Sequence, residues 1–232
     1  MLINYVPKSH LEKFGIKILD ILSPGSYFVG GMVRDLLLKR KITDIDIATG
    51  LKPEMIIRRL GDNKIAYGDQ HKNFGVILAK QGSVTIEITT FRAEAYGKSR
   101  FPKIQFIKNT KQDSQRRDFT VNALYFNPKD KAIRDFHNGV GDLQKKLVRF
   151  VGNPTQKIKE DPLRILRALR FTVDLNFKLE KQTRNAIKKH LADVSSLSRS
   201  KIEQELGKVK TKTGRDKIKK VINNPKTFDK YF

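Results

Sequence analysis

The chain has 232 residues, a length sufficient for one large domain or two small ones. Hydrophobic residues make up 38% of it and charged residues 31%. Its 48 Lys and Arg against 24 Asp and Glu give a formal net charge of +24. It contains no cysteine, which excludes disulfides and thiolate metal sites. No apolar run approaches the roughly 20 residues of a membrane-spanning helix, and the N-terminus lacks the apolar core of a secretory signal, so we expect a cytoplasmic protein without a membrane partner.

The excess of positive charge favours a polyanionic partner, and nucleic acid before an anionic membrane. The charge is unevenly spread, since residues 141–232 carry 24 basic and 10 acidic residues. A solvated, lysine-rich surface is the alternative that composition alone leaves open.

The first two-thirds of the chain is expected to mix strands and helices. Its expected elements are, in chain order, a strand over 26–29, a helix over 32–40, a strand over 43–48, a helix over 53–60, and two strands over 74–79 and 83–91. The first strand ends in Gly30-Gly31, and Pro53 opens its helix at the first turn. The residues Lys80-Gln81-Gly82 between the last two strands indicate a hairpin.

Beyond about residue 140 the pattern changes to helices, which are expected over 158–171, 179–191, 198–209 and 214–221. We therefore expect a mixed α/β part over residues 1–140 and a basic helical part over 141–232.

Asp44 and Asp46 occupy positions i and i+2 of the expected strand over 43–48, so their side chains project from the same face. Two adjacent carboxylates repel each other unless a cation lies between them. Hard divalent ions with oxygen ligands, Mg²⁺ above all, suit such a pair. A solvated acid pair on an exposed strand is the alternative for these two residues alone.

The turn before the first expected helix carries Gly30 and Gly31, which allow the backbone to approach a ligand closely. The helix that follows offers unpaired N–H groups to a phosphate, and Arg34 lies in its first turn, where a guanidinium reaches a triphosphate. A tight turn without a ligand is the alternative for the glycines.

Four motifs in order resemble one family. GGMVRD at 30–35 followed by DIDIAT at 44–49 resembles the signature of the class II tRNA nucleotidyltransferases and bacterial poly(A) polymerases, in the DNA polymerase β superfamily. RRDFTVNA at 116–123 is similar to the second motif of that family, and Asp135 with Gly139 and Asp142 to its third. EDPLRILR at 160–167 is similar to the fourth, so the resemblance covers roughly residues 25–172.

The resemblance implies an α+β fold: a nucleotidyltransferase head with a mixed sheet and helices over 1–140, then a helical neck and basic C-terminal region over 141–232. Because the chain ends soon after the fourth motif, the body and tail of full family members are expected to be reduced or absent. The oligomeric state is not predicted.

The implied activity is template-independent addition of nucleotides from CTP and ATP to the 3′ end of tRNA, with release of pyrophosphate. Asp44 and Asp46 would hold two Mg²⁺ ions, one at the tRNA 3′ hydroxyl and one at the departing pyrophosphate. Glu87 is either the third carboxylate of the superfamily or a surface glutamate. The second motif implies contacts to ribose and phosphates by residues that include Arg117, Asp118 and Asn122.

The fourth motif implies that Asp161 and Arg164 imitate the edge of a complementary base and select CTP and then ATP. The alternative is an intrahelical salt bridge on the one helix face that they are expected to share. Arg167 and Arg170 continue the stripe toward the triphosphate, with pairing of Arg170 to a neighbouring acid as its alternative.

Tyr96 and Arg100 belong to a segment, 96–102, that resembles the flexible loop of full CCA-adding enzymes, although Lys98 stands where the family prefers Asp. The resemblance of this segment to that loop implies that the final A is added. We expect the basic C-terminal residues to contact tRNA phosphates, with these candidates: Lys208, Lys210, Lys212, Arg215, Lys217, Lys219 and Lys220.

Three alternatives from the same family remain: an enzyme that adds only CC, one that adds only A, and a poly(A) polymerase. An alternative from another class is a catalytically inactive RNA-binding relative. The intact acids argue against that alternative, because an inactive protein has no need to keep paired carboxylates.

Overall fold

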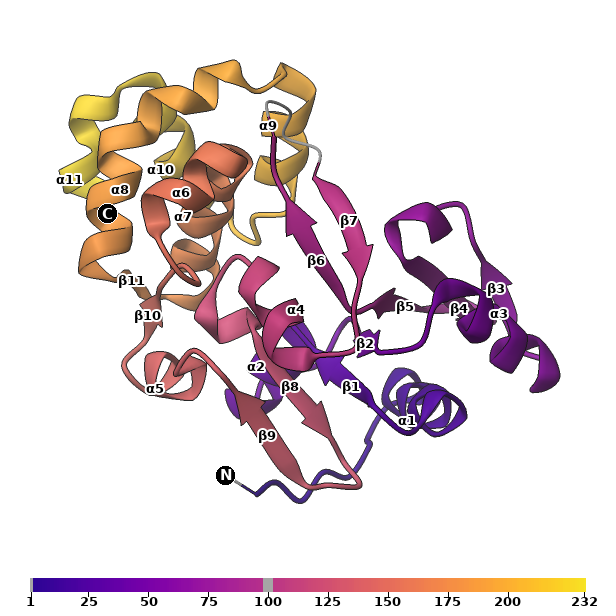
Figure 1. Cartoon of the computed structure of the whole chain (residues 1–232). Helices are drawn as coiled ribbons and strands as arrows, with labels where there is room; N and C mark the ends of the chain where they lie inside the picture. Colours follow the sequence, from indigo (N-terminus) through magenta and orange to yellow (C-terminus); the bar gives the residue numbers. More distant parts are fainter. Residues whose placement is uncertain (1, 98–101) are drawn as a thin grey trace. The chain divides into compact units, whose positions relative to one another are not determined.

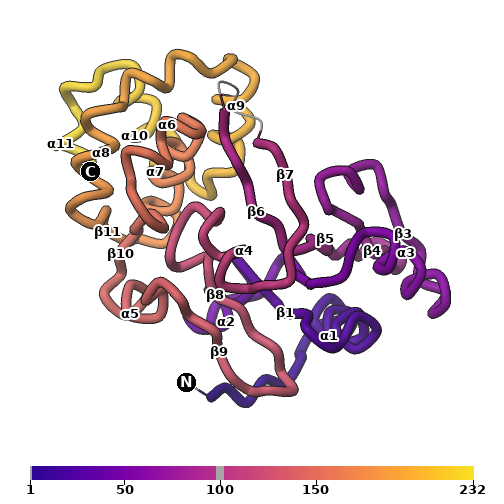
Figure 2. The backbone as a smooth tube through the Cα atoms, in the orientation of Figure 1, coloured from indigo at the N-terminus to yellow at the C-terminus, as the bar shows by residue number. Residues whose placement is uncertain are grey.

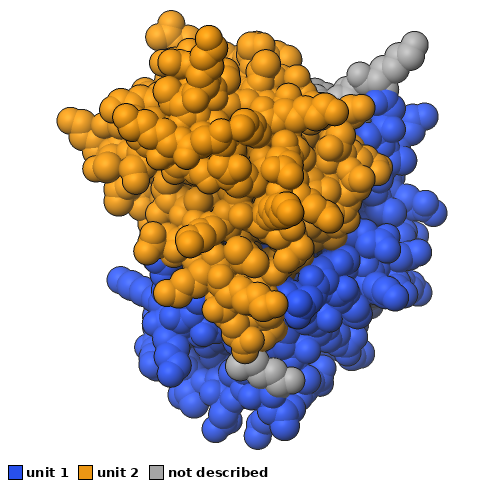
Figure 3. Space-filling model, turned by 90° about the vertical axis from the view of Figure 1, so that its left-hand side faces the viewer, with its two compact units in different colours: residues 1–117, 122–139 blue, residues 118–121, 140–232 orange. Residues whose placement is uncertain are grey.

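The computed structural model describes residues 2–97 and 102–232. The chain forms two compact units, which are coloured separately in Figure 3: unit 1 comprises residues 1–117 and 122–139, and unit 2 comprises residues 118–121 and 140–232. The short segment 118–121 therefore groups with unit 2, although it lies within the first part of the chain that we delimited from sequence. Within the described residues, no helix has the length and apolar character needed to cross a membrane.

Unit 1 is built on a mixed sheet, which comprises seven strands among the described residues, in the order β3-β4-β5-β2-β1-β8-β9 (Figure 1). Its strands are β1 (Ser26–Val29), β2 (Asp46–Thr49), β3 (Ala66–Gly68), β4 (Val76–Gln81), β5 (Val84–Thr90), β8 (Leu124–Asn127) and β9 (Ala132–Asp135). Strand β1 is antiparallel to β2 and β8, whereas β2 and β5 run parallel. The sheet therefore brings chain segments that are far apart in sequence next to β2.

The helical elements of this part of the chain are α1 (His10–Leu22), α2 (Gly31–Leu37), α3 (Pro53–Asp62), α4 (Thr110–Arg116) and the 3-10 turns η1 (Lys72–Phe74) and η2 (Thr120–Asn122). Helices α1 and α3 lie beside each other and pack on the sheet (Figure 1). Gly15 permits this, because a Cβ there would lie 2.9 Å from Ile45 Cδ1 and 3.2 Å from Phe28 Cε1. The apolar face of α1 thus closes one side of the core of unit 1.

A separate two-stranded ribbon follows β5. Strands β6 (Arg92–Ala95) and β7 (Lys103–Phe106) pair antiparallel, and Figure 2 shows them as a narrow ribbon. Helix α4 packs against β6.

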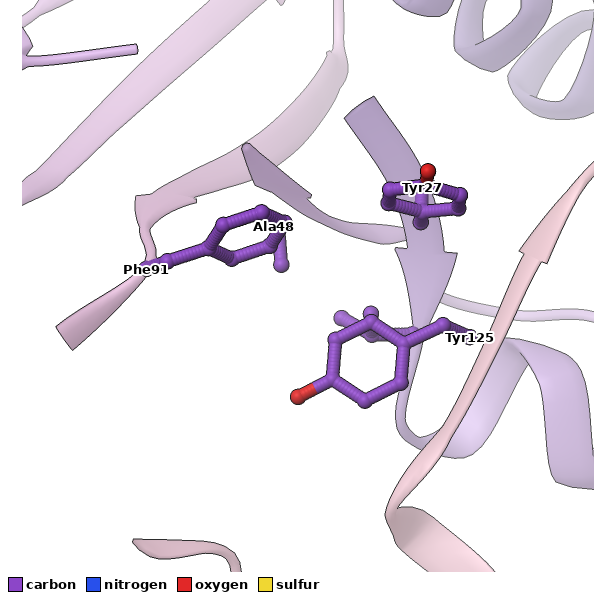
Figure 4. Close-up of a cluster of buried hydrophobic side chains, with 5 residues drawn as sticks. Tyr27, Ala48, Phe91 and Tyr125 are labelled. Carbon is purple, nitrogen blue, oxygen red and sulfur yellow. The ribbon is translucent and has the colours of Figure 1, made fainter. Parts of the chain in front are cut away.

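The other face of the sheet carries a buried aromatic cluster of Tyr27, Val29, Ala48, Phe91 and Tyr125 (Figure 4). The rings of Tyr27 and Phe91 stack with centroids 6.3 Å apart, and Tyr125 meets Tyr27 edge-on at 6.2 Å. Burial of three such rings provides much of the stability of this face. The cluster gives the nearby end of β2 a rigid support.

Unit 2 is mainly helical. After α5 (Gly139–Gln144) its elements are β10 (Leu147–Val148), α6 (Pro154–Glu160), α7 (Leu163–Leu175), β11 (Lys178–Leu179), α8 (Lys181–His190), η3 (Leu191–Ser196), α9 (Arg199–Gly207), α10 (Lys212–Asn223), η4 (Pro225–Thr227) and α11 (Phe228–Tyr231). The ring of Phe119 stacks on Phe150 at 4.9 Å and meets Phe171 edge-on at 5.4 Å. This contact anchors the segment 118–121 in the core of unit 2.

The expected single helix over 158–171 is wrong: the structure has two helices, α6 and α7, that are separated at Asp161 and Pro162. Proline lacks the N–H that a helix interior requires, and it disfavours the helical conformation at the residue before it. Asp161 accordingly has φ −154° and ψ 106°, which is extended. The strand expected over 43–48 also begins later, at Asp46, so Asp44 precedes the strand and the predicted placement of both aspartates on one strand is wrong.

Candidate active site

The turn between β1 and α2 faces the two aspartates. Gly30 has φ 68° and ψ −133°, a conformation that L-residues with side chains rarely adopt. A Cβ on Gly30 would lie 3.4 Å from Asp46 Oδ2, and one on Gly31 would lie 3.7 Å from Asp44 Oδ2. A methyl group at either glycine would therefore be in van der Waals contact with a carboxylate, so the glycines let the backbone of the turn lie directly beside both acids.

Asp46 is the first residue of β2, and the parallel register sets it opposite Glu87 of β5. Asp46 is half-buried, whereas Asp44 and Glu87 are exposed. Burial, and then the neighbouring charges of Glu87 and Asp44, raises the pKa of Asp46 to about 7, while Arg117 acts in the opposite direction. The negative charges of Glu87 and Asp44 thus oppose the ionisation of Asp46, and a bound cation would relieve that repulsion.

A divalent cation fits these residues. Within residues 2–97 and 102–232, no group of three or more His, Cys, Asp and Glu side chains is placed to hold a metal ion. The protein therefore offers the pair Asp44 and Asp46, with Glu87 nearby on the adjacent strand. Mg²⁺ is commonly held by one or two carboxylates, with water and substrate phosphate completing its shell, so a pair of carboxylates suffices on the protein's side.

Arg34 lies in α2 with its side chain 10% exposed. Its Nε and Nη2 donate to the two carboxylate oxygens of Asp35, at 3.0 and 2.8 Å, and its Nη1 donates to Asn122 Oδ1 at 2.8 Å. Two predicted site residues, Arg34 and Asn122, are therefore brought together, but they bind each other. Triphosphate contact by Arg34 stays a prediction, and the geometry favours a supporting role.

Arg117 follows the last residue of α4 and is 14% exposed at its side chain. Its Nε donates to the Tyr125 hydroxyl at 2.9 Å, its Nη2 donates to Asp113 Oδ2 at 3.2 Å, and its guanidinium lies 5.0 Å from the centre of the Tyr125 ring. Although burial opposes the charge, Tyr125 and Asp113 raise the pKa of Arg117 above its ordinary value. Arg117 is thus a fixed cation in the electrostatic field of Asp46.

The next residue, Asp118, belongs to unit 2 and binds two arginines of α7. Its Oδ1 accepts from Arg164 Nε at 2.9 Å, and its Oδ2 accepts from Arg167 Nε. Burial opposes ionisation, yet Arg167 and Arg164 hold the pKa of Asp118 below its usual range. Three of the predicted nucleotide-binding residues are therefore gathered in one ion-pair network.

The predicted shared helix face of Asp161 and Arg164 is wrong, because the helix is broken between them. Asp161 Oδ1 accepts from the Leu163 N–H at 3.2 Å, which is a local turn before α7. Arg164 is buried, and besides Asp118 its guanidinium donates to Glu160 and to the carbonyl oxygen of Lys157. These partners fix the guanidinium in one orientation. The base-reading role of the pair is left untested by this geometry.

Arg170 donates from Nε to Glu205 Oε1 at 2.6 Å and lies over the Phe171 ring at 4.4 Å. Glu205 is only 2% exposed. The structure therefore favours pairing with a neighbouring acid, the alternative we gave for Arg170, over contact with a triphosphate.

Within the third motif, Asp135 Oδ1 accepts from the backbone N–H groups of His137 and Gly139, which closes a turn in unit 1. Asp142 Oδ2 accepts from Thr120 Oγ1 at 2.7 Å in unit 2. In the loop segment, Tyr96 donates its hydroxyl hydrogen to Glu94 Oε2 at 2.9 Å, whereas Arg100 and Lys98 lie outside the described residues.

Three residues that support the site were missed from sequence: Asp113, Tyr125 and Glu160. Asp113 lies three and four residues before Arg116 and Arg117, a helical ion-pair spacing that could have indicated it. Glu160 lies four residues before Arg164 and carried the same signal. Tyr125 gave none, because its contact depends on the sheet.

Unit 1 thus combines a mixed sheet, two aspartates beside a Gly-Gly turn and an ion-paired arginine at one site. The chain belongs to the family of the poly A polymerase head domain, whose model matches residues 26–149. This match, with the relatives and solved structures described next, confirms the resemblance drawn from the four motifs and the expected α+β head and neck. The nucleotidyltransferase family uses divalent metal ions in general.

Relatives that are similar to this chain in sequence are named as CCA-adding enzymes. The chain is 42% identical over 193 residues to the CCA-adding enzyme of Lactobacillus delbrueckii subsp. bulgaricus, covering 82% of this chain and 47% of that one. It is 43% identical over 186 residues to the CCA-adding enzyme of Staphylococcus haemolyticus, covering 79% and 45%. The chain spans about half the length of the curated relatives it matches.

Solved structures are similar as well. The CCA-adding enzyme of Bacillus stearothermophilus in complex with CTP matches with a TM-score of 0.77 at 29% identity, over 87% of this chain and 49% of that one. A tRNA nucleotidyltransferase complexed with a primer tRNA and an incoming ATP analog matches with a TM-score of 0.71 at 28% identity, over 93% and 60%.

Proposed function

We propose that this chain adds nucleotides from CTP and ATP to the 3′ end of tRNA, completing its CCA terminus and releasing pyrophosphate. The observation that carries the proposal is the close approach of the Gly30-Gly31 turn to both carboxylates, where a Cβ would already be in van der Waals contact with Asp46 and Asp44. The relatives named as CCA-adding enzymes, and the similar structures with CTP and with primer tRNA, support the choice of substrates.

Asp44 and Asp46 hold two Mg²⁺ ions in this proposal, with Glu87 as the nearby third carboxylate. When bound, the ions would activate the RNA 3′ hydroxyl and neutralise the charge of the departing pyrophosphate. Arg117 supplies fixed positive charge at the same sheet face, held by Tyr125 and Asp113. The chain's own part is to position these groups, since phosphoryl transfer depends mainly on positioning and charge neutralisation.

Selection of the nucleotide is assigned to Asp161 and Arg164. A carboxylate only accepts hydrogen bonds and a guanidinium only donates them, so the two together match a base edge that carries both a donor and an acceptor. The anchoring of Arg164 by Asp118 and Glu160 supports this role, because a fixed donor discriminates between bases better than a mobile one. Arg167, which shares Asp118, is the nearest further cation of the network.

The test is the product formed on a tRNA transcript that ends at the discriminator base, with CTP alone, ATP alone and both together. Addition of C, C and A only in the combined reaction is expected. Addition of CC alone, of a single A, or of a long A tract would replace the proposal with the corresponding alternative. The poly(A) alternative has specific support in the description of the matching head-domain family.

The variant D44A/D46A is expected to lose incorporation while keeping its thermal melting temperature, and E54A/D62A on the exposed side of α3 is its matched control. Retained incorporation in D44A/D46A would exclude the metal assignment. An inactive wild type that still binds tRNA would instead favour the RNA-binding alternative. The number of ions and the cytoplasmic location stay predictions.

A further inference from the structure

A hollow lies in unit 1, with a volume of about 490 Å³. This volume falls within the roughly 300–1,000 Å³ typical of small-ligand sites. It is lined by Pro24, Gly25, Tyr27, Gly50, Leu51, Phe91, Lys108, Asn109, Thr110 and Arg134. None of the candidate site residues described above is among them.

The hollow shares a sheet face with Asp46. In the antiparallel pairing of β1 and β2, Val29 lies opposite Asp46 and Tyr27 lies opposite Ala48. Paired residues point to one face, so the Tyr27 ring and the Asp46 carboxylate project from the same side. The hollow begins at Gly50, four residues along from Asp46, which is roughly 13 Å at about 3.3 Å per residue.

Small residues keep the space open at its inner wall. A Cβ on Gly50 would lie 3.7 Å from the Phe91 ring and 3.9 Å from Lys108 Cα, so the chain at Lys108 crosses close above the glycine. Gly25 has φ 83°, and a Cβ there would meet nothing within 4 Å. Phe91 and Tyr27, 2% and 6% exposed, form a rigid floor.

The rim is positively charged. Lys108 and Arg134 line the hollow from different segments, and its ten lining residues include no Asp or Glu. The Arg134 guanidinium stacks over the Tyr27 ring at 4.5 Å, which fixes its plane. Its ion pair with Asp130 is 3.9 Å long and exposed on both sides, so it neutralises little of the charge. Asn109 and Thr110 add neutral polar groups.

We propose that this hollow binds a sugar-phosphate unit of the RNA primer, a few nucleotides behind its 3′ end. The inference rests on the proposed function, because it takes the 3′ hydroxyl to lie at Asp46. Because Ala48 and Tyr125 are buried between Asp46 and the hollow, the RNA would pass around this cluster, so its path exceeds about 13 Å and spans at least about four nucleotides at about 3.4 Å each. Two cations without a carboxylate fit a phosphodiester, and an aromatic floor with a stacked arginine is common in single-strand binding sites.

A free nucleoside triphosphate offers the same phosphate chemistry, and the test separates the two sources. The variant K108Q/R134Q removes both charges of the rim. The variant R58Q/K72Q removes two exposed charges elsewhere in unit 1 and is the matched control. The variant K108R/R134K keeps the charge. Binding of a fluorescent tRNA transcript that ends at the discriminator base is measured by anisotropy across a salt series, and CTP binding is measured separately with Mg²⁺.

We expect K108Q/R134Q to weaken RNA binding about tenfold and to reduce the slope of log K against log salt by about 1 to 2. The control should change RNA affinity less than about twofold, and CTP affinity should be unchanged in every variant. K108R/R134K should weaken RNA binding less than K108Q/R134Q, because lysine keeps the charge of Arg134 but not the guanidinium that stacks on Tyr27.

If the rim variant and the control weakened RNA binding equally, the effect would be one of total charge, and the proposal would be overturned. Unchanged RNA binding, or a loss confined to CTP binding, would overturn it as well. These binding measurements need no catalysis. A wild type that adds no nucleotide would therefore count against the proposed function, while RNA binding by the rim variant and the control could still be compared.

Discussion

The carboxylate of Asp113 accepts a hydrogen bond from Arg117 Nη2 at 3.2 Å and another from the Tyr125 hydroxyl at 2.6 Å. Its other oxygen accepts from Arg116 Nε at 2.8 Å and from the Arg92 backbone N–H at 3.1 Å. Asp113 is completely buried, so all of these bonds lie away from water. One acid thereby links the site arginine, the sheet and the start of the β6–β7 ribbon.

Replacing Asp113 should therefore destabilise the protein. D113A would leave Arg116 and Arg117 without their shared buried partner, and loss of one member of a buried pair costs about 3–5 kcal/mol. We expect the free energy of unfolding, from urea denaturation, to fall by about that amount, and D113N to fall less because it keeps some hydrogen bonds. D62A, at an exposed position of α3, should change the free energy of unfolding little. A D113A variant as stable as D62A would contradict the anchoring role.

The ion pairs of Asp118 predict that the folded protein loses stability in acid. Burial opposes its ionisation, but Arg167 and Arg164 lower its pKa in the folded protein, below the roughly 3.9 expected in the unfolded chain. Its ionised form thus stabilises the fold at pH values above the unfolded pKa, and that contribution is lost as the pH falls through the folded pKa.

We expect D118N to lower the melting temperature at pH 7 and to lose less melting temperature than the wild type between pH 5 and pH 3. E54Q, at an exposed position of α3, should follow the wild type across this range. Parallel wild-type and D118N curves would exclude Asp118 as a contributor to the acid sensitivity.

The pairing of Arg170 with Glu205 predicts that replacing Arg170 lowers the stability of the protein without weakening substrate binding. If Arg170 supports the neck by pairing with the buried Glu205, then R170M and E205Q should each destabilise the protein. Their double-mutant cycle should give a coupling of about 0.5–3 kcal/mol. The KM for CTP should stay near the wild-type value in R170M. A large rise in KM without loss of stability would restore the triphosphate contact that we predicted from sequence.

The acid pair predicts metal-dependent stability. In buffer with EDTA, D44N/D46N should be at least as stable as the wild type, because it removes like charges that repel. Addition of Mg²⁺ should then raise the melting temperature of the wild type, by an amount that grows with the ion concentration, and should leave D44N/D46N unchanged. E54Q/D62N is the control for nonspecific ion effects. An equal rise in all three proteins would show that the acids are not the binding site.

The parts of the site that are local in sequence could be predicted from it. The Gly30 turn and the position of β1 depend on residues within about one element of each other, and the charge of Asp44 acts on Asp46 as expected although Asp44 precedes β2. The break at Pro162 was also local, and we overlooked it because the apolar spacing continues across the proline. The helix rule for proline outweighs that spacing.

The partners of the arginines could not be predicted in the same way. Arg34 binds Asn122, and Arg170 binds Glu205, across 88 and 35 residues of chain. A motif fixes which arginines are present, but the fold decides which of them remain accessible to a substrate. The strands β8 and β9, which carry Tyr125 and Arg134, are short, and we did not predict them.

The segment 118–121 has a consequence for how the two units depend on each other. The chain leaves unit 1 after Arg117, contributes Phe119 to the core of unit 2, and returns to unit 1 at Asn122. Neither unit is a continuous stretch of polypeptide, so no single cut yields both intact. A fragment ending at residue 139 would keep Phe119 but lose Phe150 and Phe171, and it would expose that ring to water. The same polypeptide therefore passes through both units, and a cut within the segment 118–121 interrupts the chain of each.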